Sequence, residues 1–310
     1  GHMWQEEGWG YALFPDRESL TQRFEDFLSA IREAVETSGL SAAVYTQTTD
    51  IETENNGLMT YDREIVKIDA EAISLASRGY LPPRIVRRAP IFLDRTLVEF
   101  APALSDATIR YTIDGSAPSV ASRQYEGAFE ITASTTVKSR AFWQDGTASR
   151  VSTVEYTRAE AHAAEAVEDL EPGLLVEYFE QDGSWRELPE FESLNANNTT
   201  VAQTVDLVLA PSSENFGLRF RGFVNVPADG VYGFHVTSDD GSRLFVDGEQ
   251  VVDNDGVHGA RERSGYVALE AGKHPIELVF FQGRGGVALT FEYDGPGFEK
   301  RVVEGEVLFH

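Results

Sequence analysis

The chain has 310 residues, of which 42% are apolar and 11% aromatic, and this is enough for two or three domains with cores of their own. Acidic residues outnumber basic ones 51 to 26, and the net charge of −25 argues against nucleic acid or an anionic membrane as a partner. The absence of cysteine excludes disulfides and thiolate metal sites.

The N-terminal part has an α/β pattern. Gly1-His2-Met3 has the sequence of an expression-vector remnant. Pro15-Asp16 begins a predicted helix whose apolar residues recur at helical spacing, and Gly39 ends it. Residues 40–45 then predict a short buried strand, followed by a polar loop over 47–56. This order is typical of a (β/α) barrel, but a barrel takes about 250 residues, so only a part of one is expected.

The middle of the chain changes to short alternating strands after Pro82-Pro83. Strands are predicted at 108–113, 129–131 and 135–142, with Asp-Gly turns between them, and this spacing indicates a small β-sandwich. The Ala- and Glu-rich segment 158–173 predicts a helical linker.

The last part, residues 174–310, is again predicted to be all β. Alternation of apolar and polar residues marks strands at 216–220, 230–236, 274–281 and 287–293. A glycine-rich loop, residues 282–286, comes directly before the last of them.

The turn that holds Asp239 and Asp240 is the most informative feature of this last part. Neighbouring side chains of a regular strand point to opposite faces, but a turn or a cis bond can bring both carboxylates to one side. A hard cation such as calcium, which prefers oxygen ligands, would then compensate their repulsion. The alternative is a hairpin in which Asp and Gly only satisfy the geometry of the turn.

Each of the three parts resembles a known family. Residues 39–63 resemble the end of the catalytic barrel in glycoside hydrolase family two, the β-galactosidase-like enzymes. Residues 89–157, with Ile109–Pro118, resemble the chitobiase/β-hexosaminidase C-terminal module, which is fibronectin-III-like. Residues 174–296 resemble the protective-antigen-type (PA-fourteen) carbohydrate-binding module.

These resemblances imply a mainly β, multidomain fold. It would consist of a (β/α) barrel remnant, a β-sandwich, a helical linker and a protective-antigen-type β-barrel or sandwich. The corresponding ranges are 1–82, 83–157, 158–173 and 174–310.

The hydrolase resemblance implies no catalytic residue within the chain. The two catalytic glutamates of that family belong to barrel strands upstream of residue 1, so the chain alone is expected to be inactive. In the intact enzyme the loop after the final strand would form part of the substrate rim, with Gln47, Thr48, Thr49 and Asp50. In this chain alone we expect these four residues to form a solvated polar loop.

The PA-fourteen resemblance implies a calcium-dependent sugar site. In sugar-binding members of that family an Asp-Asp pair joined by a cis bond holds calcium, a later loop supplies further oxygens, and sugar hydroxyls complete the shell. The corresponding metal ligands here would be Asp239, Asp240, Gln282, Gly283 and Gly285. Arg284 departs from that pattern and would replace the charge of the cation or guard the pocket, and Trp185 would stack on a sugar ring.

The sequence therefore predicts the non-catalytic C-terminal region of a secreted or periplasmic, multimodular glycoside hydrolase of the family-two type. Its partners would be a polysaccharide or oligosaccharide, the upstream catalytic barrel, and a second copy of the chain. Two alternatives stay open. Either the β modules are purely structural and bind no sugar, or the chain completes an active hydrolase together with an upstream barrel piece.

Overall fold

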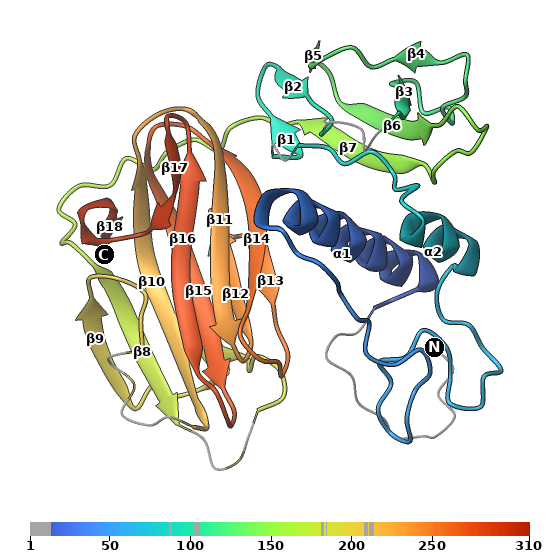
Figure 1. Cartoon of the computed structure of the whole chain (residues 1–310). Coiled ribbons are helices and arrows are strands. Elements are labelled where there is room, and N and C mark those ends of the chain that lie inside the picture. The colour runs from blue at the N-terminus through green and yellow to red at the C-terminus, as the bar shows by residue number, and fades with distance from the viewer. Residues whose placement is uncertain are drawn as a thin grey trace. The chain divides into compact units, whose positions relative to one another are not determined.

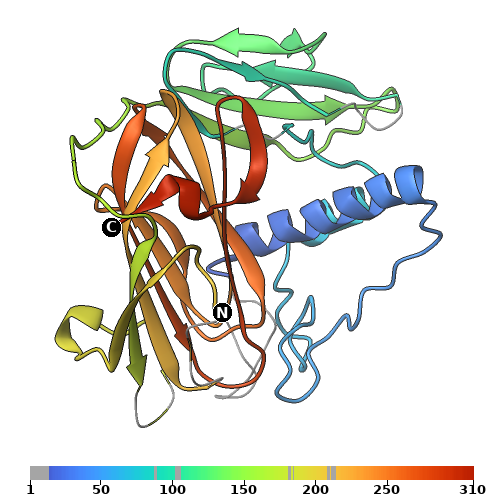
Figure 2. The ribbon, with the colours of Figure 1, turned by 90° about the vertical axis from the view of Figure 1, so that its left-hand side faces the viewer.

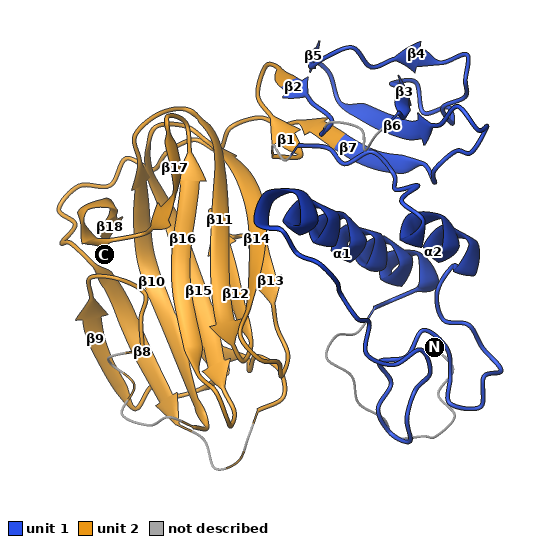
Figure 3. Cartoon of the chain, viewed as in Figure 1, with its two compact units in different colours: residues 1–88, 97–155 blue, residues 89–96, 156–310 orange. Residues whose placement is uncertain are grey.

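The computed structural model describes residues 14–86, 89–101, 106–180, 183, 185–207, 210 and 214–310, so Gly1-His2-Met3 lie outside the described residues. The chain divides into two compact units, which are coloured separately in Figure 3. The first comprises residues 1–88 and 97–155, and the second comprises residues 89–96 and 156–310. Strands dominate the regular structure (Figure 1), which confirms the mainly β, multidomain fold class.

Helix α1 (Arg17–Ser38) forms where the apolar spacing predicts it. Asp16 caps the first turn by accepting a backbone hydrogen bond of 2.7 Å. Gly39 ends the helix at φ 69°, a left-handed conformation that glycine adopts without steric cost. The apolar stripe stays partly bare, since Phe27 and Val35 are 49% and 47% exposed. No described helix is long and apolar enough to cross a membrane.

Residues 40–45 do not form the predicted buried strand. This segment is irregular and exposed in the structure, and Val44 is 88% exposed. A strand is stable only when neighbouring strands pair with its backbone, and no described strand pairs with residues 40–45. Helix α2 (Ala70–Ser77) follows the loop and begins at Asp69, whose carboxylate accepts two backbone hydrogen bonds.

The sandwich strands confirm the sequence pattern closely. One sheet has the order β1-β7-β6-β3-β4, and β2 pairs with β5 in a separate two-stranded sheet. Tyr111 and Phe129 stack at 4.3 Å between ring centroids, and Val137 is fully buried. The bounds are β1 (Ile91–Phe92), β2 (Thr96–Val98), β3 (Thr108–Thr112), β4 (Arg123–Gln124), β5 (Phe129–Ile131), β6 (Thr135–Phe142) and β7 (Ser152–Arg158).

The segment 158–173 is extended, and the prediction of a helical linker is wrong. The backbone N–H of His162 donates to the carbonyl of Ala268 at 2.8 Å, and that of Glu165 donates to the carbonyl of Lys273 at 2.8 Å. These hydrogen bonds attach the segment to β14 (Arg261–Leu269) and β15 (Gly272–Gln282) of the same unit. The modest helix preference of Ala and Glu is smaller than the gain from this pairing.

The second unit contains a seven-stranded sheet and a four-stranded sheet. The larger has the order β13-β12-β15-β10-β8-β9 with β18 also on β10, and the smaller has the order β14-β11-β16-β17. Its long strands run alongside one another in both ribbon views (Figures 1 and 2). The bounds are β8 (Leu174–Glu180), β9 (Asn198–Ala202), β10 (Phe216–Val226), β11 (Gly230–Asp239), β12 (Ser242–Val246), β13 (Glu249–Asn254), β14 (Arg261–Leu269), β15 (Gly272–Gln282), β16 (Ala288–Gly295), β17 (Phe298–Val302) and β18 (Leu308–Phe309), with short 3-10 turns at Phe191–Ser193 and Gly305–Val307.

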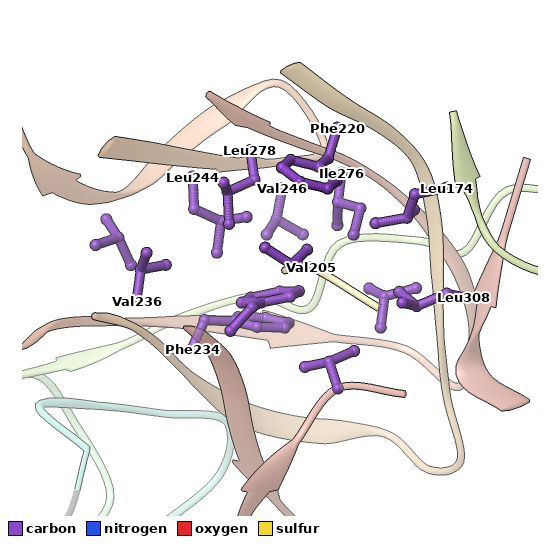
Figure 4. Close-up of a cluster of buried hydrophobic side chains, with 14 of the residues drawn as sticks. Leu174, Val205, Phe220, Phe234, Val236, Leu244, Val246, Ile276, Leu278 and Leu308 are labelled. Atoms are coloured by element: carbon purple, nitrogen blue, oxygen red, sulfur yellow. The ribbon is translucent and has the colours of Figure 1, made fainter. Parts of the chain in front are cut away.

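The core of this unit lies between the two sheets. Alternate residues of β11 point inward from one sheet, and alternate residues of β12 and β15 point inward from the other (Figure 4). Phe234, Leu244 and Leu278 are fully buried there. The strands predicted at 216–220, 230–236, 274–281 and 287–293 are all present, and each continues beyond its predicted end. The sheets thus hold the β11–β12 turn and the loop after β15 at fixed positions.

Candidate functional site

The candidate site is the turn between β11 and β12. Asp239 ends β11, and its peptide bond with Asp240 is cis. Asp240 is only 2% exposed, whereas Asp239 is partly exposed. Beneath the turn, the buried hydroxyls of Ser238 and Ser242 contact each other at 2.8 Å. The acidic pair therefore stands on a polar end of the core rather than on an apolar one.

Asp240 connects two loops through its carboxylate. Its Oδ1 accepts the backbone N–H of His258 at 3.0 Å. Its Oδ2 accepts the backbone N–H of Gly283 at 2.9 Å. Each carboxylate oxygen has two lone pairs, so one acceptor position on each oxygen is still available for a cation.

Asp239 carries a charge that its surroundings do not fully compensate. Burial raises the pKa of its carboxyl group, and the neighbouring charge of Asp240 raises it further. A backbone hydrogen bond from Ala260 and the nearby His258 lower the pKa in part. Because the net direction is upward, the ionised form is disfavoured, and a bound cation would favour it.

Gln282 places an unpartnered oxygen at the end of β15. The side chain is fully buried, and its Nε2 donates to the carbonyl of Gly286 at 2.7 Å. Its Oε1 has no hydrogen-bond partner among the described residues. A buried amide oxygen without a partner costs about 1–3 kcal/mol, and an oxygen-binding cation would satisfy it.

Gly286 brings its loop close to Asp239. A Cβ atom at this position would lie 2.8 Å from Oδ2 of Asp239, closer than real Cβ atoms come to other heavy atoms. Only glycine therefore lets the loop and the carboxylate approach in this way. The two carboxylates, the unpartnered amide oxygen and the carbonyls of the glycine loop are all oxygen donors, the type of ligand that calcium prefers.

Backbone, water or ligand oxygens would have to complete such a site. In the described part of the chain no three His, Asp or Glu side chains gather closely enough to form a metal centre by themselves. Calcium takes six to eight oxygens, more than the two carboxylates and Gln282 supply. Gly283 also holds the loop through its carbonyl, which accepts the backbone N–H of Asn215 at 2.9 Å.

The structure brings together most of the residues predicted for this site. Asp239, Asp240, Gln282 and Gly283 are joined by the contacts above. Gly285 lies in the same loop with φ 101° and open space around its Cα. The cation and sugar roles assigned to these residues stay predictions.

The other two predicted site residues differ in their surroundings, since Arg284 is exposed and Trp185 packs in an apolar cluster. Arg284 is exposed, and its guanidinium makes no ion pair with any described residue, the two aspartates included. Its predicted role in replacing the charge of the cation or guarding the pocket stays a prediction. Trp185 packs edge-on against Phe191, with 6.3 Å between ring centroids, in a small apolar cluster with Phe179 and Val279. In the structure Trp185 thus packs within this cluster, and its stacking on a sugar ring stays a prediction.

Three contributors were not found from the sequence. His258 and Ala260 act through backbone N–H groups, and a backbone donor leaves no signature in residue type. Asn215 lies beside Gly283, and its buried Oδ1 has no partner among the described residues. The one signal in the sequence was an asparagine just before a predicted strand, because Asn tolerates a positive φ better than most residues, and Asn215 has φ 56° in the structure.

The predicted substrate rim forms a separate small structure in the first unit. Asp50 is 1% exposed, and its Oδ1 accepts from Lys67 Nζ at 2.6 Å and from the backbone N–H of Gly57 at 2.8 Å. The expectation of a solvated loop is therefore wrong for Asp50, because the ion pair draws it inward. Gln47 has a buried Nε2 without a described partner, and Thr48 is exposed. Thr49 pairs with Met59 through an isolated bridge.

Comparisons with known proteins agree with two of the three resemblances. Residues 170–305 match the family model described as the PA14 domain, and residues 92–153 match the chitobiase/beta-hexosaminidase C-terminal domain. Among curated proteins, the anti-sigma-I factor RsgI3 of Acetivibrio thermocellus is 27% identical over 97 residues, which are 31% of this chain. The match spans only 15% of the length of that protein.

Solved structures with a partial likeness include two PA14 domains. The PA14 domain of the MpAFP antifreeze protein is 20% identical with a TM-score of 0.40, covering 48% of this chain and 96% of that one. The PA14 sugar-binding domain from an RTX adhesin is 23% identical with a TM-score of 0.39, covering 45% of this chain and 98% of that one. The resemblance of residues 39–63 to family-two hydrolases stays a prediction, whereas the resemblances of the other two parts agree with the family models that match residues 170–305 and 92–153.

Proposed function

We propose that the second unit binds carbohydrate through a calcium ion held by Asp239 and Asp240. The observation that carries this proposal is the contact between the turn of the two aspartates and the loop after β15. Gly283 N–H donates to Asp240 there, and the preceding residue, Gln282, has a buried, unpartnered Oε1. The match of residues 170–305 to the PA14 domain model supports it. A bound calcium ion would offer open coordination positions to vicinal sugar hydroxyls.

The protein residues would have distinct tasks in this binding. Asp239 and Asp240 would hold the cation with their carboxylates, and Gln282 with its amide oxygen. Gly283 keeps Asp240 in place through its N–H, and the backbone of the 282–286 loop would add carbonyl oxygens. The loop turns at Gly285, where φ is 101°.

We extend the proposal to the protein that contains this chain. It would be a secreted or periplasmic polysaccharide-degrading hydrolase of the family-two type, with its catalytic glutamates upstream and this region supporting the barrel. The match of residues 92–153 to a domain named after chitobiase supports a role beside a glycosidase. The partly bare stripe of α1 and the exposed segment 40–45 support packing against an upstream barrel or a second copy of the chain.

A second candidate function is purely structural. Both oxygens of Asp240 accept backbone hydrogen bonds, and these alone could explain why an aspartate closes the turn. That alternative gives Asp239 and the Oε1 of Gln282 no task. It also predicts that calcium leaves the protein unchanged.

Binding to a glycan array with and without a calcium chelator separates the two functions. The whole chain is compared with Asp239→Asn, which removes one charge while keeping the shape of the side chain. Glu299→Gln, on β17 of the same unit, removes one charge from an exposed strand and serves as the matched control. We expect chelator-sensitive binding that Asp239→Asn loses and Glu299→Gln retains. Binding that is insensitive to chelator in all three proteins would contradict the proposal.

A further inference from the structure

Arg284 is anchored beside the acidic pair by its own loop. On one side of it, the N–H of Gly283 donates to Asp240 at 2.9 Å. On the other side, the carbonyl of Gly286 accepts from the buried side chain of Gln282 at 2.7 Å. The backbone that carries Arg284 is therefore fixed relative to Asp240 and Gln282, while its side chain is exposed.

Arg284, like Arg186 and Arg263 of the same unit, forms no ion pair with any described residue, and its place beside the acidic pair is what sets it apart. Arg219 pairs with Glu177 at 2.7 Å, and Arg243 pairs with Asp255 at 2.9 Å. No carboxylate within the described ranges forms an ion pair with Arg284. In a chain with 51 acidic and 26 basic residues, an arginine without an anionic partner beside a pair of aspartates has a guanidinium available for an external anion.

The local charge favours such an anion once calcium is bound. A divalent cation neutralises the two aspartates, and Arg284 then leaves the loop with one positive charge. The acidic groups elsewhere on the chain repel anions, but screening at physiological ionic strength limits that repulsion to about 8 Å. Asp255, which approaches the turn at Gly241, is paired with Arg243 at 2.9 Å. For a ligand in contact with the loop, the charge of Arg284 therefore outweighs the screened acidic groups further away.

We propose that this surface selects glycans with an anionic substituent, a carboxylate or a sulfate, and that Arg284 recognises that group. The planar guanidinium offers paired N–H donors that match both anions. The space beside Arg284 is open at Gly285, where a Cβ atom would meet nothing within 4 Å. This inference rests on the proposed calcium-dependent carbohydrate binding and adds the chemical class of the glycan.

Matched oligosaccharides test the inference on the whole chain. Trigalacturonate is compared with its methyl ester, which has the same rings without the charge, and sulfated galactan oligosaccharides are compared with their desulfated forms. Affinities are measured by calorimetry in calcium and in chelator, for the unmodified chain, for Arg284→Gln and for Arg263→Gln. Arg263 lies in β14 outside the loop, so its substitution removes the same charge elsewhere in the unit.

We expect calcium-dependent binding of at least one anionic probe, with an affinity at least tenfold higher than that of its neutral counterpart. The reason is that a hydrogen bond to a charged group contributes enough free energy to change an affinity by about tenfold or more. Arg284→Gln should remove the preference, and Arg263→Gln should keep it. The carboxylate and sulfate arms show which anion is recognised. Equal, calcium-dependent binding of charged and neutral probes would overturn the role of Arg284 and leave the proposed function standing. Absence of calcium-dependent binding to every probe would overturn both.

Discussion

Adding one methyl group to Gly286 should abolish calcium binding while leaving the fold intact. In Gly286→Ala the new Cβ would lie 2.8 Å from Oδ2 of Asp239, and ordinary contact begins at 3.4 Å. The carboxylate therefore has to move by about 0.6 Å. Metal–ligand distances are fixed to within about 0.2 Å, so this displacement takes Asp239 out of any coordination position. The atom that moves is the end of a partly exposed side chain, so the cost to folding stays small.

The expected magnitude follows from mass action. Calcium at one hundred times its dissociation constant should stabilise the unmodified chain by about 2.7 kcal/mol. For a unit of this size that corresponds to a rise of about 5–10 °C in melting temperature. In chelator, Gly286→Ala should melt within about 4 °C of the unmodified chain, since a loss below about 1 kcal/mol shifts a unit of this size by no more than that. Calcium should produce no rise in its melting temperature.

Thermal unfolding, followed in chelator and across a calcium titration up to millimolar concentration, measures both quantities. Gly259→Ala is the matched control, because it adds the same methyl group in the neighbouring loop, where a Cβ atom would meet nothing within 4 Å. We expect the control to keep the full calcium response. The reasoning is refuted if Gly286→Ala responds to calcium as the unmodified chain does, or if the unmodified chain shows no response at all.

Three further predictions concern the first unit and the activity of the chain. Burial raises the pKa of Glu25 from 4.5 to about 7 against the opposing charge of Arg150, so stability should fall as pH rises between these values, by up to about 3 kcal/mol. Denaturant unfolding at pH 5 and pH 8 should show that loss in the unmodified chain and a smaller one in Glu25→Gln, and equal losses would contradict it. Asp50→Asn should cost about 2 kcal/mol by breaking the contact with Lys67, whereas a Thr48→Ala control should cost less than about 0.5 kcal/mol in the same assay. The chain alone should not hydrolyse an aryl β-galactoside, and turnover that survives repurification would disprove this.

Regular elements were predictable where the residues of one segment decide the outcome. The helix at Arg17–Ser38 is set by its cap and its terminal glycine, and β5 and β6 end where their alternation ends. The predictions of a strand at residues 40–45 and of a helix at residues 158–173 were wrong, because the conformation of these segments depends on partners distant in sequence. The first segment has no paired strand among the described residues, and the second gains backbone partners on β14 and β15.

In the candidate site, too, the residue types could be predicted from the sequence, whereas the contacts that position them depend on segments distant in sequence. Asp239, Asp240 and Gln282 could be named from the sequence because carboxylate and amide oxygens are visible as residue types beside glycine-rich turns. What holds them in place is backbone, namely the N–H groups of His258 and Gly283 on Asp240, and any residue except proline supplies that group. A substitution at His258 that keeps the path of the backbone should therefore preserve the contact with Asp240. The position of the acidic pair is thus a property of three loops together, and only the fold that aligns β11, β12 and β15 brings those loops to one place.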